Sequence, residues 1–444
     1  MTWVPFVLGQ SRGPRNMAAR VPTIVARFGL TPRKSLAHLA VLLGITDRWA
    51  VRPTLPVTAV VARRHPQVMH WLADRGVELA AHGYVHNDYA ALAREAQYEQ
   101  VQRAHDELLR LGLRVQGWRC PYSRWNAHTL PAVRAAGFAY DATPTYAWPA
   151  YAQEHIALAP HAAADFARLC RLFGVRDAGR QSVLPTMVDG LVQIPMSIPQ
   201  DEDMVDRVHL DAASMSRVWR RVLQEARQRR DIVVLCVHPE RAALCAAPLD
   251  ATLREARGWG DIWLAPLEDI AAWWRERAGA RVTVHTGGDG RWHVAVQGPS
   301  RLVTGRGAQL LNGSGVLTVS SPHRPVIGAG PAWPAPTLHR LHEAGYLCED
   351  GTADRRSAIG DRRSDRPSPN AERQTPNAER YALDLDRALP ADTPPDAVVR
   401  FVAERDTDLV RVQPWPAGYR SCLSVTGDID AVTLFDFARR MKEF

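Results

Sequence analysis

The sequence predicts an α/β fold built on a parallel sheet or barrel, and three observations lead to this prediction. Short apolar segments, such as VELAAHG (77–83) and DIVVLCVHP (231–239), alternate with helical segments between residues 17 and 275. The helical segments are amphipathic and often end at glycine, as AQYEQVQRAHDELLRLG (96–112) does. Polar residues gather where the apolar segments end. Strand–helix alternation is typical of parallel sheets, and barrel sites form at the strand ends.

The chain divides into four parts by composition. Residues 17–275 carry the strand–helix alternation, and residues 281–346 show period-two alternation with glycine-rich turns, which predicts a small β-rich appendage. Residues 350–395 include DRRS twice and PNAER twice, which predicts a disordered linker. Residues 396–444 carry a strand, SCLSVTGD, and a short helix, LFDFARRMKEF. A lone strand and helix cannot fold alone, so this last part needs a host.

Composition argues against two classes of partner. The formal net charge is +8, but Lys34 and Lys442 are the only lysines, and the arginines are scattered rather than clustered. A nucleic-acid-binding protein is therefore not expected. No apolar run approaches the roughly 20 residues of a membrane span, and no signal peptide is visible. We therefore expect a cytoplasmic protein, unless the start codon is misassigned. Nothing in the sequence predicts an oligomeric state.

Two short motifs at opposite ends of the sequence carry metal-ligand residue types. HGYVHND contains His82 and His86, and TGDID contains Asp428 and Asp430. Imidazole and carboxylate ligands suit zinc and related divalent ions, and a site with three protein ligands keeps a position open. Taken singly, each motif has an ordinary interpretation: core or surface histidines, and aspartates that form a turn after a glycine. The hypothesis of a metal site therefore requires that the two ends of the chain meet.

Two further motifs carry groups suited to hydrolysis. GWRCPY contains Arg119, which can grip a carboxylate, and Tyr122, whose backbone N–H can face an oxyanion. VVLCVHPE places His238 directly after an apolar strand, where it can protonate a leaving amine. A surface arginine beside a turn and a strand-end histidine bonded to a carbonyl are the alternatives.

Taken in this order, the motifs resemble those of the polysaccharide deacetylases, the NodB homology domain of carbohydrate esterase family 4. That family has H-x3-H, then R-x-P-Y (here from Arg119 to Tyr122), then L-x-x-H-P (here from Leu235 to Pro239). The resemblance covers about residues 50–275. It implies a distorted (β/α) barrel of the glycoside hydrolase/deacetylase type. It also implies a metal-dependent reaction that removes N- or O-acetyl groups from sugars.

One element of the family is missing from its usual place. The family begins with a strand that ends in paired aspartates, but Asp47 is the only acidic residue among residues 1–50. LSVTGDIDAVTLFDF, near the C-terminus, resembles the missing strand and helix. We therefore expect a circular permutation in which the end of the chain supplies the first barrel strand. A linker of about 40 residues spans roughly 35 Å, which makes this closure feasible.

The resemblance also implies a role for each residue. The metal ligands would be His82, His86 and Asp430, with zinc the expected ion and other divalent transition metals possible. Asp428 would be the general base, steered by Arg119. Tyr122 would line the oxyanion site, and His238 would be the general acid. The D-x-x-D-W motif of the family has no clean match, and Asp141 is only a loose candidate for it.

Three alternatives stay open at this stage. The C-terminal strand could begin a truncated second domain, which would leave the first without its carboxylates. The protein could be an inactive, carbohydrate-binding relative of the deacetylases. It could also hydrolyse a linear or cyclic amide that is not a sugar. The leading expectation is a deacetylase whose substrate is an acetylated saccharide or a glycan precursor.

Overall fold

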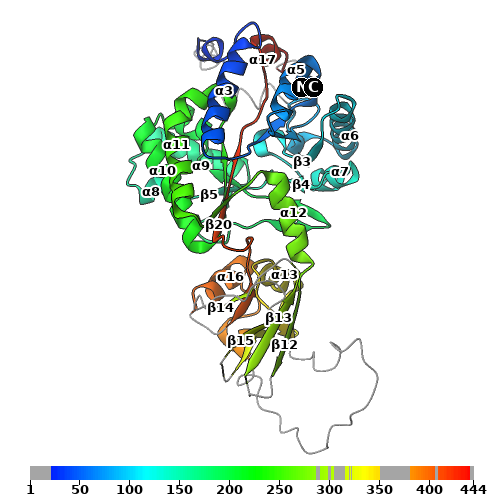
Figure 1. Ribbon diagram of the computed structural model, residues 1–444, viewed down its shortest axis with the longest axis vertical. Helices are drawn as coiled ribbons and strands as arrows, with labels where there is room; N and C mark the ends of the chain where they lie inside the picture. Colours follow the sequence, from blue (N-terminus) through cyan, green and yellow to red (C-terminus); the bar gives the residue numbers. More distant parts are fainter. Residues whose placement is uncertain are drawn as a thin grey trace, which may run out of the picture. The chain divides into compact units, whose positions relative to one another are not determined.

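The computed structural model describes residues 22–286, 291–298, 302–304, 316–319, 321, 323–350, 381–405 and 409–440. The chain forms two compact units, which are described separately. The first consists of Met1–Gly179, Pro185–Ala272 and Tyr419–Phe444, and the second of Arg180–Leu184 and Trp273–Gly418. The first unit therefore combines the N-terminal part of the chain with its last 26 residues, as the colours of Figure 1 show.

The first unit is organised around one large, curled sheet. Its strand order is β10-β20-β1-β2-β3-β4-β8-β7, with β11 also paired to β20. All these pairings are parallel except that of β7 with β8. The strands are β1 (Thr54–Val57), β2 (Glu78–Ala81), β3 (Val115–Trp118), β4 (Tyr140–Asp141), β7 (Thr186–Val188), β8 (Leu191–Gln193), β10 (Ile232–Cys236), β11 (Ile262–Leu264) and β20 (Ser421–Thr426). This parallel, helix-covered sheet confirms the predicted fold class.

A small parallel sheet completes the curl. It has the order β6-β5-β9 and consists of β5 (Thr145–Ala147), β6 (Arg176–Asp177) and β9 (Met196–Ile198). The strand β9 lies beside β10 without a backbone ladder in the described residues. Instead the amide of Val234 donates to Oγ of Ser197 at 3.2 Å.

Helices cover the outside of the curled sheet (Figure 1). Helices α3, α11 and α10 pack in succession along one side. Apolar residues at helical spacing bury the inner face of α10, as Val218, Trp219 and Val222 do. The helices are α3 (Arg33–Arg48), α4 (Ala59–Arg64), α5 (Pro66–Ala73), α6 (Arg94–Arg110), α7 (Thr129–Ala135), α8 (Ala150–Gln153), α9 (Pro160–Leu172), α10 (Ala212–Arg229), α11 (Ala242–Trp259), α12 (Leu267–Ala278) and α17 (Leu434–Arg440).

The C-terminal strand β20 is a central strand of this sheet. It pairs with β10 from Cys422 to Thr426 and with β1 at Thr426. All six of its residues are buried, which suits a run of apolar and small hydroxyl side chains. Each fully buried Leu or Val side chain stabilises the fold by about 1.5–3 kcal/mol. The hydroxyl of Ser421 donates to the carbonyl of Asp231 at 2.6 Å, so this buried polar group is satisfied.

The described residues of the second unit form three small sheets. Strands β12 (Arg281–Thr286), β13 (Trp292–Gln297) and β15 (Val316–Val319) form an antiparallel sheet, and β14 (Leu302–Thr304) pairs with β19 (Val410–Val412). Strand β16 (Arg324–Ala329) pairs in parallel with β17 (Cys348–Asp350) and β18 (Tyr381–Asp384). The helices of this unit are α13 (Ala335–Glu343), α15 (Leu385–Ala388) and α16 (Pro395–Ala403).

The sequence-based description of this unit needs one correction. Residues 281–346, predicted as β-rich, contain the strands β12 to β16 and the helix α13. The linker predicted for 350–395 is wrong for residues 381–395, which contain β18 and α15; residues 351–380 lie outside the described part of the chain. Tyr381 and Leu385 are buried, and the Tyr381 ring lies where a Cβ of Gly328 would be. These few apolar residues suffice to order the segment despite its polar composition.

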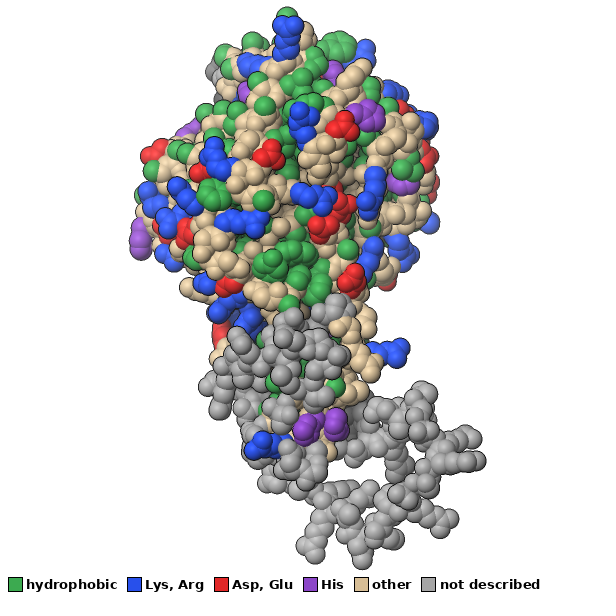
Figure 2. All heavy atoms as spheres, in the orientation of Figure 1, with side chains coloured by type: hydrophobic (Ala, Val, Ile, Leu, Met, Phe, Trp, Pro, Cys, Tyr) green, Lys and Arg blue, Asp and Glu red, His purple; other side chains and the backbone are tan. Residues whose placement is uncertain are grey.

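The surface adds two observations. On the face of the first unit that Figure 2 shows, basic side chains are dispersed among acidic and apolar ones. No helix in the described part of the chain is both long enough and apolar enough to cross a membrane.

Candidate metal centre and active site

The residues singled out from the sequence follow the carboxyl ends of strands in one sheet. His82 comes directly after β2 and Arg119 directly after β3, while His238 lies two residues beyond β10. Asp428 and Asp430 follow β20, which lies between β10 and β1. Because parallel strands end at the same edge, these groups converge although the chain separates them widely.

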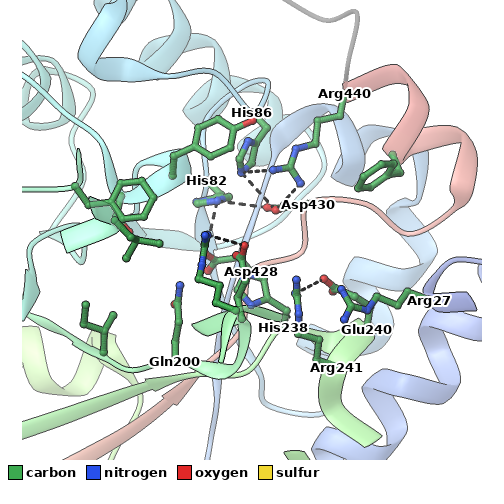
Figure 3. A pocket seen from close by; sticks show the side chains of 18 of the residues that line it. Arg27, His82, His86, Gln200, His238, Glu240, Arg241, Asp428, Asp430 and Arg440 are labelled. Carbon is green, nitrogen blue, oxygen red and sulfur yellow. Dashed lines mark hydrogen bonds and ion pairs between the residues drawn. The ribbon is translucent and has the colours of Figure 1, made fainter. Parts of the chain in front are cut away.

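His82, His86 and Asp430 bring three metal-ligand atoms together (Figure 3). Nε2 of His82 lies 3.4 Å from Oδ1 of Asp430, and Nε2 of His86 lies 3.4 Å from Oδ2 of the same carboxylate. The donor atoms of all three residues lie within 4.8 Å of one another. Such spacing allows two imidazoles and a carboxylate to contact one ion at the usual zinc distances of about 2.0–2.2 Å.

The backbone around His82 fixes this arrangement. Nδ1 of His82 lies 2.9 Å from the carbonyl of Arg119. A carbonyl only accepts, so Nδ1 donates to it and Nε2 is the ring nitrogen that faces Asp430. Gly83 has φ +86°, and a Cβ there would lie 2.7 Å from the carbonyl oxygen of Val85. Glycine is therefore required at the turn that brings His86 back beside His82.

The charge states of this group suit a metal. Burial, followed by the positive charge of Arg440, lowers the pKa of His86 well below its usual value, so the imidazole is neutral at neutral pH. Burial alone would raise the pKa of Asp430, but Arg440 and the two histidines hold it well below its ordinary value. Oδ1 of Asp430 is buried and has no hydrogen-bond partner among the described residues. A neutral His86 imidazole and an ionised Asp430 carboxylate with an unsatisfied oxygen, beside a second imidazole, fit a divalent cation.

Asp428 is held differently, by a buried arginine. Nη1 of Arg119 donates to Oδ1 of Asp428 at 2.8 Å and to Oγ1 of Thr426 at 3.0 Å. Nε of Arg119 donates to the carbonyl of Ala142 at 3.2 Å. A Cβ on Gly427 would lie 2.1 Å from the carbonyl oxygen of Val237, so only glycine allows the chain to pass there. The two aspartates of TGDID are thus paired with different arginines, Asp428 with Arg119 and Asp430 with Arg440.

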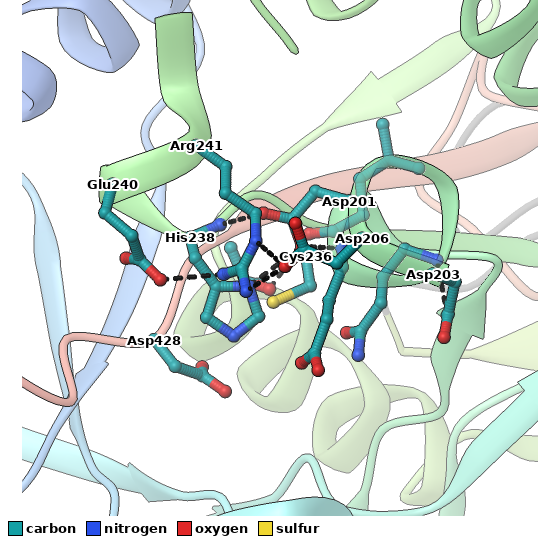
Figure 4. Close-up of polar contacts among 12 residues, drawn as sticks. Asp201, Asp203, Asp206, Cys236, His238, Glu240, Arg241 and Asp428 are labelled. Carbon is teal, nitrogen blue, oxygen red and sulfur yellow. Dashed lines mark hydrogen bonds and ion pairs between the residues drawn. The ribbon is translucent and has the colours of Figure 1, made fainter. Parts of the chain in front are cut away.

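His238 is paired with a carboxylate that the sequence analysis did not identify (Figure 4). Asp201 accepts from the backbone amide of His238 at 2.7 Å and lies 2.8 Å from its Nδ1. Burial would lower the pKa of His238, but the charge and hydrogen bond of Asp201 raise it to about 10. The imidazole is therefore protonated at neutral pH, and its Nε2–H remains for another acceptor.

Tyr122 lies beside the histidines. Its ring packs edge-on against that of His86, with centroids 4.2 Å apart. Its backbone has φ 58° and ψ 10°, a left-handed conformation that side-chain-bearing residues rarely adopt. Such strain occurs at functional sites.

One cavity of about 210 Å³ is lined by His82, His86, Tyr122, His238, Asp428, Asp430 and Arg440. Arg119 and Asp201 are not among its described lining residues. The cavity is also lined by charged side chains, among them Arg27, Glu202, Arg207, Glu240 and Arg241, and by apolar ones from the segment before α3, from the region of α9, and from β9 and α17. Its apolar side chains are those of Ile24, Phe28, Leu169, Phe173, Met196, Ile198 and Phe437. The volume is below the roughly 300–1,000 Å³ of pockets for drug-sized ligands.

The sequence analysis missed Asp201 and Arg440. Asp201 begins the acidic run DED, which comes shortly after an apolar strand, and that position was a usable signal. Arg440 lies near the end of a helix beside Arg439, and nothing local to the sequence distinguishes the two. Asp141, the loose candidate for the D-x-x-D-W motif, is buried and hydrogen-bonded to Thr143 and Gln193. It is not among the described residues that line the cavity.

The fold and the site together define a (β/α)-barrel protein with hydrolase-type residues at the strand ends. Residues 39–140 match the family model described as polysaccharide deacetylase, so this part of the chain is similar to that family. The matched range includes His82, His86, Arg119 and Tyr122. His238, Asp428 and Asp430 lie beyond it.

Solved structures with similarity to the chain include three of related description. A candidate polysaccharide deacetylase from Mycobacterium smegmatis is 24% identical over 54% of this chain and 78% of its own, with a TM-score of 0.43. A probable polysaccharide deacetylase from Pseudomonas aeruginosa PAO1 is 19% identical over 54% and 72%, with a TM-score of 0.42. The Puue allantoinase is 17% identical over 54% and 72%, with a TM-score of 0.40. No curated protein sequence matches the chain.

Proposed function

We propose that this protein is a metal-dependent hydrolase that removes an acetyl group, N-linked or O-linked, from a saccharide or glycan precursor. The observation that carries the proposal is the convergence of His82, His86 and Asp430 beside Asp428 and His238 on one cavity. The match to the polysaccharide deacetylase family supports the reaction class. Metal ligands, a base and an acid on one wall are the parts that amide hydrolysis requires.

We assign the ion to His82, His86 and Asp430, with zinc expected and other divalent transition metals as alternatives. Once bound, such an ion supplies Lewis acidity, which polarises the acetyl carbonyl and makes a water molecule more acidic. The residues around it provide the remaining steps.

Asp428 is the general base in this proposal. Its carboxylate accepts a proton from the water that attacks the acetyl carbon. Arg119 keeps that carboxylate in place through the 2.8 Å hydrogen bond. Because Arg119 is completely buried and also bonded to Thr426 and Ala142, the carboxylate is held in one orientation.

His238 is the general acid. It gives its Nε2 proton to the nitrogen or oxygen that leaves as the bond to the acetyl carbon breaks. The Asp201 carboxylate keeps the imidazole protonated and oriented, which a donor at neutral pH requires. We assign the Tyr122 backbone N–H to the oxygen on which negative charge develops, in line with the left-handed turn that presents this residue to the cavity.

We also propose that the chain is a circular permutant of the deacetylase barrel. The position of β20 between β10 and β1 supports this order, because the strand that leads to the aspartates comes last in the sequence. The alternative of a truncated second domain predicts instead that residues 419–444 can be removed without loss of metal.

A second candidate function is hydrolysis of a small amide that is not a sugar. The apolar side chains in the lining favour it, because Phe28, Phe173 and Phe437 offer no hydrogen bonds to sugar hydroxyls. The modest cavity volume also suits a small substrate better than a long glycan.

One experiment tests both functions. Full-length protein loaded with zinc is incubated with N-acetylated mono- and oligosaccharides and with linear and cyclic amides, and acetate or amine release is measured. Release from the saccharides by the native protein, absent in Asp428→Asn, is the expected result. Turnover of the amides alone favours the second candidate. Saccharide binding without any turnover indicates an inactive, carbohydrate-binding protein.

A further inference from the structure

Arg440 places a positive charge against two of the three proposed metal ligands (Figure 3). Its Nη1 donates to Oδ2 of Asp430 at 2.7 Å. Its Nη2 lies 3.2 Å from Nε2 of His86. The guanidinium therefore bridges a carboxylate and an imidazole that come from opposite ends of the sequence.

The contact with His86 uses the atom that would bind a metal. A guanidinium only donates hydrogen bonds, so Nε2 of His86 accepts through its lone pair. A metal ion needs that same lone pair. The two interactions cannot exist together at one nitrogen, and two cations close to one carboxylate also repel each other.

The helix that carries Arg440 is firmly anchored. Oδ2 of Asp436 accepts from the amide of Thr433 at 2.9 Å and lies 2.7 Å from Nε2 of His65. The ring of Phe437 packs against Phe28 with centroids 5.4 Å apart. Arg440 follows Asp436 and Phe437 by four and three residues, so it shares their face of α17.

We propose that Arg440 is an internal cation that stands in for the metal and competes with it for His86 and Asp430. This inference rests on the metal site of the proposed function. It predicts that Arg440 limits the metal affinity of the protein and stabilises the metal-free site. Metal binding then requires the guanidinium to leave at least His86.

The neighbouring Arg439 provides a matched control. Its guanidinium lies 4.6 Å from the centroid of the Phe435 ring, on another face of the helix. Substituting either arginine with glutamine removes the same charge from almost the same place in the sequence. Only Arg440 contacts the proposed ligands.

The test is a zinc titration of the full-length native protein, Arg440→Gln and Arg439→Gln, in competition with a chromophoric chelator. Loss of a charged hydrogen-bond competitor should tighten zinc binding by Arg440→Gln at least about tenfold. Arg439→Gln should stay within about twofold of the native protein. Unchanged or weaker binding by Arg440→Gln overturns the proposal and makes Arg440 a support for Asp430. If none of the three proteins binds zinc, the proposed metal site is wrong, and the proposed competition at that site is wrong as well.

Thermal unfolding gives a second readout that does not depend on activity. Without zinc, Arg440→Gln should unfold at a lower temperature than the native protein, because Asp430 loses its cation. Saturating zinc should then raise its unfolding temperature by more than it raises that of the native protein. Arg440→Met keeps the apolar part of the side chain and serves if Arg440→Gln does not fold. An equal zinc-induced increase in the native protein and the variant contradicts the proposal.

Discussion

Two clusters of metal-ligand residues lie at the same edge of the sheet, and they are built in opposite ways. His82, His86 and Asp430 form one; Asp201, Cys236 and His238 form the other. In the first, Nε2 of each histidine faces the carboxylate at 3.4 Å, too far for a hydrogen bond. In the second, Asp201 already holds the imidazole of His238 at 2.8 Å.

The difference shows how a protein can prepare one histidine for a metal and another for a proton. The pKa of His86 is lowered, chiefly by burial, whereas Asp201 raises that of His238 to about 10. Burial also raises the pKa of the Cys236 thiol well above its usual value, so the second cluster offers a neutral thiol in place of a charged ligand. The first cluster therefore favours a cation and the second keeps a proton.

The largest effect that would test this contrast comes from Asp430→Ala. Removing a direct ligand should weaken zinc binding more than about 100-fold, beyond the usual loss for an outer-shell residue, and should abolish turnover. Equilibrium dialysis with metal analysis measures the first effect, and acetate release the second. Retention of one zinc per chain would mean that the ligand set is wrong.

Asp428→Asn should separate catalysis from metal binding. We expect turnover to fall by about 10²–10⁴, the usual loss for a general base, while zinc stoichiometry stays unchanged. Native mass spectrometry of the zinc-loaded variant checks the second point. Loss of zinc together with activity would place Asp428 among the metal ligands. Its Oδ2 lies 3.6 Å from Nε2 of His82, which would allow that role.

Asp201→Asn should change the pH dependence of turnover. The native protein needs His238 protonated, so its activity should persist up to about pH 10 and fall as the pH rises through that value. Without the Asp201 charge, burial lowers the pKa of His238, and the fall should move several units toward acid pH. A pH–rate profile of kcat measures this shift. A profile identical to the native one would remove His238 from the role of acid.

Cys236→Ser should have the smallest effect. Because the buried thiol is neutral, we expect zinc affinity to stay within about twofold and turnover to change only a few-fold. The same chelator titration measures the affinity. A large loss of zinc would show that the second cluster, and not the first, holds the ion.

Much of the site could be predicted from the sequence, because the functional residues of barrels lie at the carboxyl ends of the strands. The positions of His82, Arg119 and His238 directly beyond apolar segments predicted their convergence, and the fold class is confirmed. The partnership of β20 with β10 and β1 could be proposed only through the resemblance to a deacetylase strand, since no local pattern encodes pairing across such a sequence separation.

Other features depend on tertiary contacts that no local pattern reports. Asp201 reaches His238 because β9 lies beside β10, and Arg440 reaches His86 because Phe437 and Asp436 fix one face of α17. The order of residues 381–395 depends on the pairing of β18 with β16 and on side-chain contacts such as the Tyr381 ring against Gly328. These are packing effects, and composition alone does not predict them.

The most direct test of the central claim is a crystal structure of the zinc-loaded full-length protein with anomalous data at the zinc edge. The account predicts one strong peak about 2.0–2.2 Å from Nε2 of His82, from Nε2 of His86 and from a carboxylate oxygen of Asp430. A peak at Asp201, Cys236 and His238, or one that lacks Asp430 as a ligand, would contradict it.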